Sequence, residues 1–292
     1  VAVADLVTVY VLFGDGAPPY ARDKQPPPEQ AAAKLFLVAG SAQADDEPAQ
    51  AGEGWRVGSA IEVADGRVGV VVCGADLFLD SATRLRLTDL DANRCAVRLE
   101  AGRIAADARG LFDGVQLVVA TTAGDVRVTG TVFAVEVAGA EVDARVLEGS
   151  VEVPATAGHT RTIRATEGSR LGESGARRLG AAEVERDRRL AEWLPRDVAS
   201  PTVLLEVSSD ASPVEVVVDG VTLGPAPVTA LVAPGRHEIA LCAPGASPVR
   251  EIVTLEAGER FERRYLSAPL AAAKEPEPGA GAGTQPVDAI AP

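Results

Sequence analysis

Residues Val118–Val137 read VVATTAGDVRVTGTVFAVEV, and this stretch decides the fold. In its second half, Thr131, Phe133, Val135 and Val137 occupy every other position. Successive side chains of a β-strand point to opposite faces, so these four residues are expected to face a core. The same alternation occurs in the neighbouring sequence, at Cys95, Val97 and Leu99, at Val142, Ala144 and Val146, and at Val151 and Val153. The pattern predicts an all-β protein.

Breaks that contain glycine separate these short apolar runs. They are Asp65-Gly66, Asp113-Gly114, Gly124-Asp125 and Glu148-Gly149. An earlier run has the same parity throughout, at Trp55, Val57, Ser59, Ile61 and Val63. Short strands at intervals of roughly 8–12 residues, separated by turn residues, indicate a multi-stranded β-sandwich, a barrel or a β-solenoid. None of the runs resembles the crossover helix of a β-α-β unit.

A second series of strands is expected from residue 201 onward. Its alternating apolar residues are Val203, Leu205 and Val207, then Val214, Val216 and Val218, then Ile239 and Leu241. Turns are expected at Asp219-Gly220, Pro234-Gly235 and Ala257-Gly258. Roughly 65 residues are enough for a small Ig-like sandwich, near the lower limit for a stable core.

One helix is expected between the two series, over Gly180–Leu194. Four residues recur at helical spacing: Val184, Asp187, Ala191 and Leu194. Glu185 and Arg189 are placed for a favourable i,i+4 ion pair, and Pro195 ends the pattern. The apolar stripe is narrow, so the pattern predicts a surface helix or a connector.

These patterns divide the chain into five parts: a stub and proline-rich linker (1–33), a first β-domain (34–172), a helical connector (173–200), a second β-domain (201–267) and a disordered tail (268–292). Val1–Phe13 is apolar but shorter than the ~20 residues that span a bilayer. It is either the end of a membrane or signal segment that begins upstream of Val1, or a first β-strand. The sequence contains no Met, so we expect the chain to be truncated or processed.

Composition excludes several partners. The net charge is −14, and an acidic surface repels nucleic-acid phosphates and anionic membrane surfaces.

The three cysteines have no Cys-x-x-Cys spacing. Cys73 and Cys95 lie in neighbouring strand-like runs and can pair in an oxidising compartment; alternatively, both are buried thiols, like Cys242.

No set of residues forms a catalytic or metal-binding pattern. His159 and His237 lie in different expected domains, and surface placement or partial burial explains both better than a Ser-His-Asp relay does. Asp89 and Asp91 are two closely spaced carboxylates in a segment typical of turns, which falls short of a calcium loop. We therefore predict no catalytic residue, no cofactor site and no metal ligand, and expect that the chain is not an enzyme.

From about Leu35 to Leu171, the first series resembles the FecR domain of bacterial envelope regulators. Val118–Val137 is similar to the family pattern T-x-x-G-x-V-x-V-x-G-T-x-F-x-V, and Val146–Val153 to V-x-E-G-x-V-x-V. Val57–Gly66 and Val97–Gly102 resemble its opening strands and its L-x-x-G repeat.

The residues of these motifs are interpreted as structural. Gly130 is expected to allow a close backbone approach or a bulge, after which Thr131 and Phe133 resume the inward face. Gly149, next to Glu148, is expected to permit a turn with positive φ.

The second series resembles a PEGA domain, an extracytoplasmic β-sandwich module. The similar segments are Val216–Val228, with its Asp219-Gly220 turn, and Leu231–Ile239, with its Pro234-Gly235 turn. The namesake Pro-Glu-Gly-Ala is replaced here by Ala233-Pro-Gly-Arg-His237.

These resemblances imply a function in signalling. FecR-family proteins are typically anchored by one membrane helix, receive a signal from a partner outside the cytoplasm and relay it to a sigma factor. The resemblance implies a periplasmic or cell-surface protein, anchored to the inner membrane, that recognises an envelope protein by strand addition at a sheet edge. Contact with a sigma factor would require a region upstream of Val1.

Two other hypotheses stay open. In the second hypothesis, the chain is a structural or adhesive module that binds cell-wall polysaccharide or a surface protein. A hydrolase on a β-scaffold, using Asp89, Asp91 or His159, is the third.

Overall fold

The computed structural model describes residues 33–156, 159–191, 202–210 and 213–265. Of these residues, 64% are in strands and 5% are in one helix, so the prediction of an all-β chain is confirmed. The apolar run Val1–Phe13, linker residues 14–32 and the tail 268–292 lie outside the described residues.

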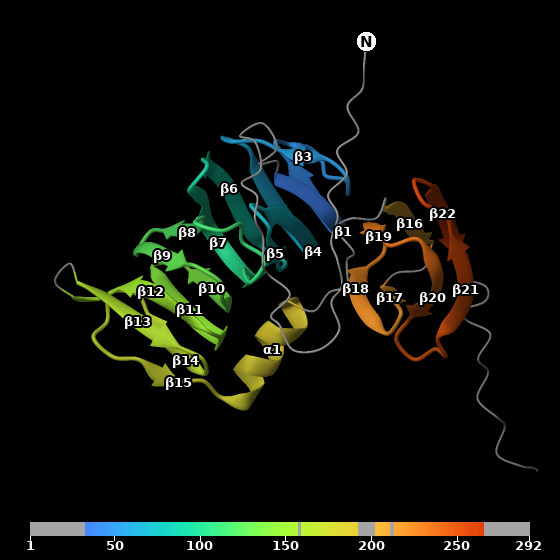
Figure 1. Cartoon of the computed structure of the whole chain (residues 1–292). Helices are drawn as coiled ribbons and strands as arrows, with labels where there is room; N and C mark the ends of the chain where they lie inside the picture. The colour runs from blue at the N-terminus through green and yellow to red at the C-terminus, as the bar shows by residue number, and fades with distance from the viewer. Residues whose placement is uncertain (1–32, 157–158, 192–201, 211–212, 266–292) are drawn as a thin grey trace, which may run out of the picture.

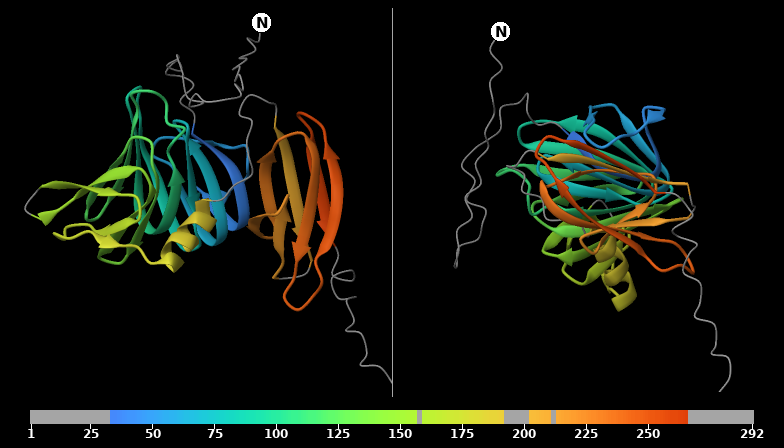
Figure 2. Two further views of the ribbon diagram at one scale, coloured as in Figure 1. Left: turned by 60° about the horizontal axis from the view of Figure 1, so that its bottom comes forward. Right: turned by 90° about the vertical axis from the view of Figure 1, so that its right-hand side faces the viewer.

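Residues 33–178, the N-terminal unit, form a sandwich of two layers around one core (Figures 1 and 2). Three long strands contribute to both layers: β1 (Ala33–Ala44), β4 (Ala60–Val72) and β7 (Arg94–Asp107). The first part of β4 pairs with β6 and its last part with β5. The first part of β7 pairs with β6 and β8, and its last part with β5 and β10. The long strands therefore join the two layers into one continuous sheet.

The helix-side layer is the one against which the helix packs. Beyond the long strands, it contains β5 (Ala75–Leu79), β10 (Val132–Ala138), β11 (Glu141–Glu148), β14 (Glu167–Arg170) and β15 (Arg177–Arg178). The far layer contains β2 (Glu47–Pro48), β6 (Thr83–Leu90), β8 (Gln116–Thr121), β9 (Gly124–Val128), β12 (Ser150–Pro154) and β13 (Thr160–Arg164). The short strand β3 (Gly54–Trp55) pairs with the start of β1, and β7 and β8 are parallel.

The core between the layers is built from the predicted alternating residues. Every residue named for the runs at 95–99, 131–137, 142–146 and 151–153 is buried. Phe133 is the largest of them and is fully buried. Branched aliphatic side chains fill most of the remaining space, as expected for a pleated surface.

Two local expectations were wrong. Val57, predicted to face inward, is 54% exposed, because a turn at residues 56–59 interrupts the alternation between β3 and β4. Asp65-Gly66 is not a turn between strands but lies inside β4, opposite β1. A Cβ atom on Gly66 would lie 2.1 Å from the Ala39 carbonyl oxygen, and the register shifts nearby, so this glycine marks a bulge where two backbones approach closely.

The structure resolves the alternatives for the cysteines. Cys73 and Cys95 form a disulfide across the core, with their Cα atoms 6.5 Å apart. The bridge links the turn after β4 to the start of β7. Cys242 is a free, half-buried thiol.

Residues 202–265, the C-terminal unit, form a second sandwich. One sheet contains β16 (Val203–Ser209), β19 (Val228–Val232) and β22 (Arg260–Tyr265). The other has the order β18 (Val221–Pro225), β17 (Glu215–Val218), β20 (Gly235–Cys242) and β21 (Val249–Leu255). The predicted inward residues of both sheets are buried.

The two units share a sheet. Strand β19 pairs antiparallel with β1, with Leu37 opposite Ala230 and Ala39 opposite Val228. The Gly40 amide donates to the Pro227 carbonyl at 2.9 Å, and the Ala51 amide donates to Thr229 Oγ1 at 3.1 Å. Figures 1 and 2 show the C-terminal unit against the edge of the N-terminal unit that β1 forms. The sheet therefore continues from one unit into the other.

The helix α1 (Ala181–Ala191) lies on the outer face of the helix-side layer, nearest β5, β7 and β11. The Gly180 amide donates to Glu183 Oε2 at 2.9 Å, which caps the first turn. The predicted pair of Glu185 and Arg189 is present at 2.8 Å. The predicted end at Pro195 lies outside the described residues.

Candidate functional site

The two FecR-like motifs meet at one end of the N-terminal sandwich. Thr131 is buried, and its Oγ1 donates a hydrogen bond to the Ser150 carbonyl at 2.7 Å. Gly149 has φ of +83°, and a Cβ atom there would lie 3.1 Å from Thr131 Oγ1. Glycine is therefore favoured at position 149 both by its backbone conformation and by its neighbour.

Gly130 does not allow the close backbone approach that the sequence suggested. Its φ is +125°, but a Cβ atom on it would meet nothing within 4 Å. The register irregularity between β10 and β11 lies further along the chain, between Val132 and Phe133. The need for glycine at position 130 therefore comes from the dihedral angle alone.

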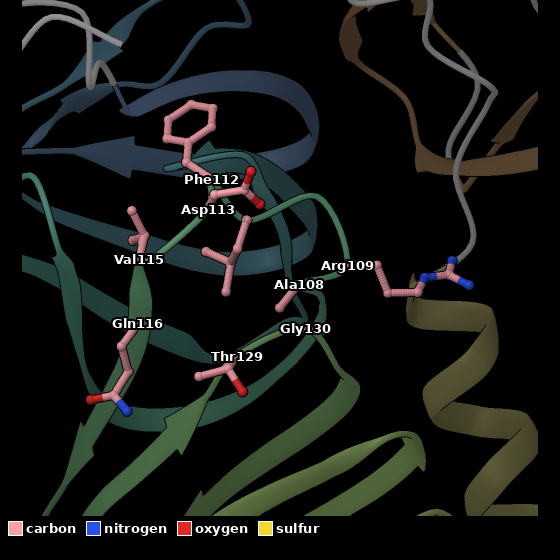
Figure 3. Close-up of a pocket in the computed structure, with 10 residues that line it drawn as sticks. Ala108, Arg109, Phe112, Asp113, Val115, Gln116, Thr129 and Gly130 are labelled. Carbon is pink, nitrogen blue, oxygen red and sulfur yellow. The ribbon is translucent and has the colours of Figure 1, made fainter. Parts of the chain in front are cut away.

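A cavity of about 420 Å³ lies beside these motifs (Figure 3). Its lining comes from the loop between β7 and β8, including Arg109, Phe112 and Asp113, and from Thr129 and Gly130. The loop is tied to the body of the sandwich by the Ala108 amide, which donates to the Thr131 carbonyl at 3.0 Å. The signature residue Gly130 thus lies in the wall of a cavity.

Ion pairs organise the rim of this cavity. Arg109 Nη2 lies 2.6 Å from Asp107 Oδ2, and its Nη1 lies 3.0 Å from Glu148 Oε2. The Glu148 side chain is more than half exposed, so these pairs contribute little stability. They place Arg109 between Asp107 and Glu148, next to the second signature motif.

The disulfide supports the same loop. The Phe112 amide donates to the Cys73 carbonyl at 3.2 Å. A Cβ atom on Gly74 would lie 2.1 Å from the Gly110 carbonyl oxygen, so the loop rests directly on the turn that carries Cys73. The cavity wall is therefore fixed to a cross-linked part of the core.

In the C-terminal unit, the two PEGA-like turns are joined by one histidine. Asp219 and Gly220 have φ of +50° and +82° and connect β17 to β18 as a tight hairpin turn. His237, two residues after Pro234-Gly235, places Nδ1 2.6 Å from Asp219 Oδ2. Its Nε2 lies 2.9 Å from the Ala233 carbonyl oxygen. His237 thus connects the two turns through Asp219 and Ala233.

These contacts make catalysis by His237 unfavourable. A histidine base needs one free nitrogen to accept a proton, and both nitrogens of His237 face acceptor oxygens. His159 is exposed. Asp89 lies within β6, and Asp91 accepts from the Ala92 amide in the turn that follows β6. Within the described ranges, no group of three or more His, Cys, Asp or Glu residues is placed to hold a metal ion.

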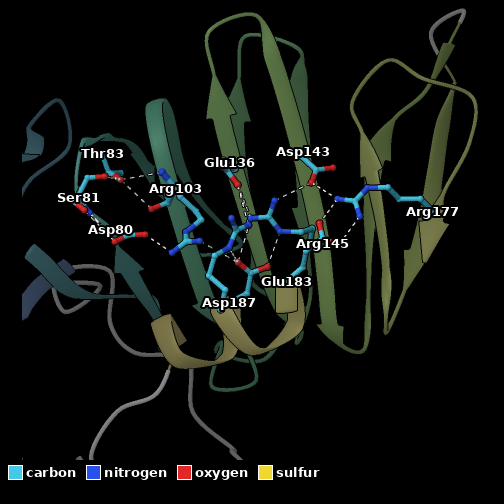
Figure 4. A network of polar contacts seen from close by, with 11 residues as sticks. Asp80, Ser81, Thr83, Arg103, Glu136, Asp143, Arg145, Arg177, Glu183 and Asp187 are labelled. Atoms are coloured by element: carbon cyan, nitrogen blue, oxygen red, sulfur yellow. Dashed lines mark hydrogen bonds and ion pairs between the residues drawn. The ribbon is translucent and has the colours of Figure 1, made fainter. Parts of the chain in front are cut away.

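Sequence reasoning missed a buried charge cluster beneath α1 (Figure 4). Asp187 is completely buried and accepts from Arg145 Nε at 2.7 Å and from Arg145 Nη2 at 3.3 Å. Arg103 Nη1 lies 3.8 Å from the same carboxylate. Burial alone would lower the pKa of Arg145, but the hydrogen bonds and charges of Asp187 and Asp143 raise it, so its guanidinium stays charged.

A second pair lies at the start of the helix. Arg177 donates to both oxygens of Glu183, at 2.7 and 2.9 Å. The hydrogen bonds from Arg177 and from the Gly180 amide lower the pKa of Glu183 to about 2. The only trace of the cluster in the sequence was Asp187 in a helical stripe, because the arginines stand on the strand faces expected to be in water.

Among the residues that the structure describes, no helix has both the length and the apolar character needed to cross a bilayer.

Comparison with known proteins agrees with the sequence motifs. The model of the FecR protein family matches residues 70–152, and the model of the PEGA domain matches residues 202–266. No curated protein matches the chain significantly. Two crystal structures of a proposed anti-sigma factor from Parabacteroides distasonis are similar at 22% and 21% identity, each with a TM-score of 0.38. Each match covers 43% of this chain and 62% of that protein, which is less than two thirds of its length.

The FecR match lies within the N-terminal sandwich, and the PEGA match spans the C-terminal sandwich and ends one residue beyond the described residues. The N-terminal unit therefore contains a FecR domain, and the C-terminal unit is a PEGA domain.

Proposed function

We propose that this chain is a non-enzymatic protein of the bacterial envelope that takes part in extracytoplasmic signalling through contact with a partner protein. The observation that carries this proposal is the FecR domain, whose two signature motifs converge beside a cavity of about 420 Å³. Arg109 links the rim of that cavity to Glu148. The proposal places the partner contact at this rim.

The chemistry of the polar groups favours recognition over reaction. Arg109 is paired with two carboxylates, and it can exchange the exposed Glu148 carboxylate for a carboxylate of a partner at little cost in stability. The two nitrogens of His237 are engaged with Asp219 and Ala233. Arg109 and His237 therefore serve as hydrogen-bonding and charged groups at defined positions, which suits recognition of a partner.

The disulfide supports a location outside the cytoplasm. Disulfides persist in the periplasm and at the cell surface, and are rare in reducing compartments. The bridge between Cys73 and Cys95 lies in the core beneath the cavity loop. We place the chain in the periplasm or at the cell surface, with an anchor in the inner membrane through residues at or upstream of Val1.

We propose recognition at the cavity rim in place of strand addition at the edge of β1. The edge of β1 is paired with β19 of the PEGA domain, so this edge is already completed within the chain. A partner would have to displace β19 to add a strand there. The cavity rim is free of that competition, which favours it as the contact.

The test is a genetic one that uses the full-length gene in its own host. Deleting the gene is expected to change the transcription of a defined set of genes, and the wild-type gene should restore it. The Arg109→Glu variant should fail to restore it, because the reversed charge repels Asp107, Glu148 and an acidic partner group. The matched control is Arg127→Glu, on the exposed surface of β9, which should restore transcription.

Thermal unfolding of both purified variants separates loss of recognition from loss of the fold. If the deletion leaves transcription unchanged while the protein is retained on purified peptidoglycan, the signalling proposal is wrong. That result would favour the structural or adhesive alternative.

A further inference from the structure

One face of α1 is complementary to the sheet beneath it. The side chains that contact the sheet are Glu183, Arg186, Asp187 and Leu190, at positions i, i+3, i+4 and i+7 of one helix face. Glu183 pairs with Arg177, and Arg186 Nη2 lies 3.3 Å from Glu136 Oε2. The pattern is acid, base, acid and apolar, read from the first turn to the last.

The sheet offers a matching series of receptors. Arg177 stands on β15, Glu136 on β10, Arg145 on β11 and Arg103 on β7, so the receptors for one helix come from four strands (Figure 4). Leu190 belongs to an apolar cluster with Phe36, Phe78, Ala105 and Ala134 on the same outer face. Polar recognition at one end and apolar contact at the other fix both the position and the direction of a helix.

The part of the outer face beneath α1, formed by Arg103, Glu136, Arg145, Arg177 and the apolar cluster, is called the groove below. It holds α1 by ion pairs and apolar contacts. An isolated helix of 11 residues is marginal in water, so α1 depends on the sheet for its stability. Buried ion pairs gain little net stability, because removing charges from water offsets most of their attraction. Breaking the pair without replacement is unfavourable, since Arg145 is 98% buried with only Asp143 and Glu136 left as partners. The groove therefore favours occupation by a helix with this pattern, whichever chain supplies it.

The C-terminal end of α1 is linked to the PEGA domain through one residue. Arg67 of β4 donates from Nη2 to the Leu190 carbonyl at 2.5 Å and from Nη1 to the Thr222 carbonyl at 3.1 Å. Its guanidinium lies 4.7 Å from the centre of the Phe78 ring. A shift of the PEGA domain would therefore change a contact that holds the end of α1.

We propose that the outer face of the helix-side layer is a docking groove for a helix of a partner protein, and that α1 occupies it until it is displaced. The partner helix would carry the pattern acid-x-x-base-acid-x-x-apolar, as in Glu183–Leu190. The inference deepens the proposed function by defining a second surface and the chemistry of its partner, and it rests on that function only for the existence of a partner.

A peptide with the sequence of Ala181–Ala191, blocked at both ends and labelled with a fluorophore, tests the groove directly. In the wild-type chain, α1 competes with the peptide. The apparent affinity of the peptide is therefore its intrinsic affinity multiplied by the fraction of chains in which α1 has left the groove. In the full chain with Asp187→Asn, α1 is weakened and the peptide should bind about tenfold more tightly or better. A peptide that itself carries the Asp187→Asn change should bind the variant chain no more tightly than the unchanged peptide binds the wild-type chain.

Equal affinity of the peptide for the wild-type and the folded Asp187→Asn chain would overturn the proposal. If that variant does not fold, Leu190→Ala weakens α1 without removing a charge and is measured in the same way. These binding measurements use the isolated chain, so their failure is distinct from the failure of the genetic test of signalling.

Hydrogen exchange of the wild-type chain provides a test without any variant. Amides of α1 should exchange faster than those of β7 and β10, and excess unlabelled peptide should increase the exchange of α1 alone. Protection of α1 equal to that of β7, with no response to the peptide, would mean that the helix is released only on global unfolding. That result would also overturn the proposal.

Discussion

The two faces of the helix-side layer are made by the same strands, but they are buried in different ways. The inner face carries Phe133 and a series of branched aliphatic residues, and the far layer of the same unit covers it. The outer face mixes Phe36 and Phe78 with Arg103 and Arg145, and the helix and the PEGA domain cover it. Burial of the inner face is therefore a property of one unit, whereas burial of the outer face depends on segments that follow much later in the chain.

The largest expected loss of stability comes from a matched pair of substitutions, one on each face of the layer. Phe133→Ala removes a fully buried ring from the inner face, and it should lower the free energy of unfolding by about 3–5 kcal/mol. Phe78→Ala, on the outer face, removes a ring that contacts Phe36 at 5.5 Å between centroids. It should cost less, because the PEGA domain and α1 can shift into the space. Urea unfolding measures both, and equal losses would contradict the comparison.

The disulfide gives the second largest effect and concerns the inner face alone. Replacing Cys73 and Cys95 by Ser opens a loop with a sequence separation of 22 residues, which should lower stability by about 3 kcal/mol. The matched control is Cys242→Ser, at the free thiol of the C-terminal unit, for which we expect a change of less than about 1 kcal/mol. Urea unfolding with and without reductant checks the prediction. If the double variant is as stable as the control, the bridge does not support the core.

The same comparison explains how much of the fold the sequence predicted. Alternation identified the inner face of β7, β10, β11 and β12, because a strand that packs against its own sandwich has a strict period of two. The turns at Asp219-Gly220 and Glu148-Gly149 also followed from local chemistry, since positive φ favours glycine and its neighbours.

The outer face did not follow from the sequence for a physical reason. Arg67, Arg103 and Arg145 stand at positions of a strand that normally face water, and only the later packing of α1 and the PEGA domain buries them. Asp187 was recognised as part of a helical stripe, but the sequence does not indicate which arginine lies opposite. The cavity beside Gly130 was missed because its wall is a loop without periodicity.

Arg67→Ala sharpens the comparison from the outer face. The variant loses the hydrogen bonds to Leu190 and Thr222 and the contact with the Phe78 ring, and we expect a loss of about 1–3 kcal/mol. Because the contact between the two units is weakened, the N-terminal unit and the C-terminal unit should unfold in separate transitions. Arg98→Ala, on the exposed surface of β7, is the control and should change stability by less than about 0.5 kcal/mol. Calorimetry that shows one transition for Arg67→Ala would mean that the shared sheet alone couples the units.

The smallest expected effect is a pH dependence of α1 itself. The pKa of Glu183 falls from its ordinary value of 4.5 to about 2 on folding, so the unfolded state binds the proton more readily. The stability that Glu183 contributes is therefore present above about pH 4.5 and is lost as the pH falls towards 2. The effect is small because the carboxylate is about a third exposed and is screened by water. Hydrogen-exchange protection of α1, relative to β7, should decrease across this range in the wild type and stay constant in Glu183→Gln. An equal decrease in both chains would assign the acid sensitivity of the helix to groups other than Glu183.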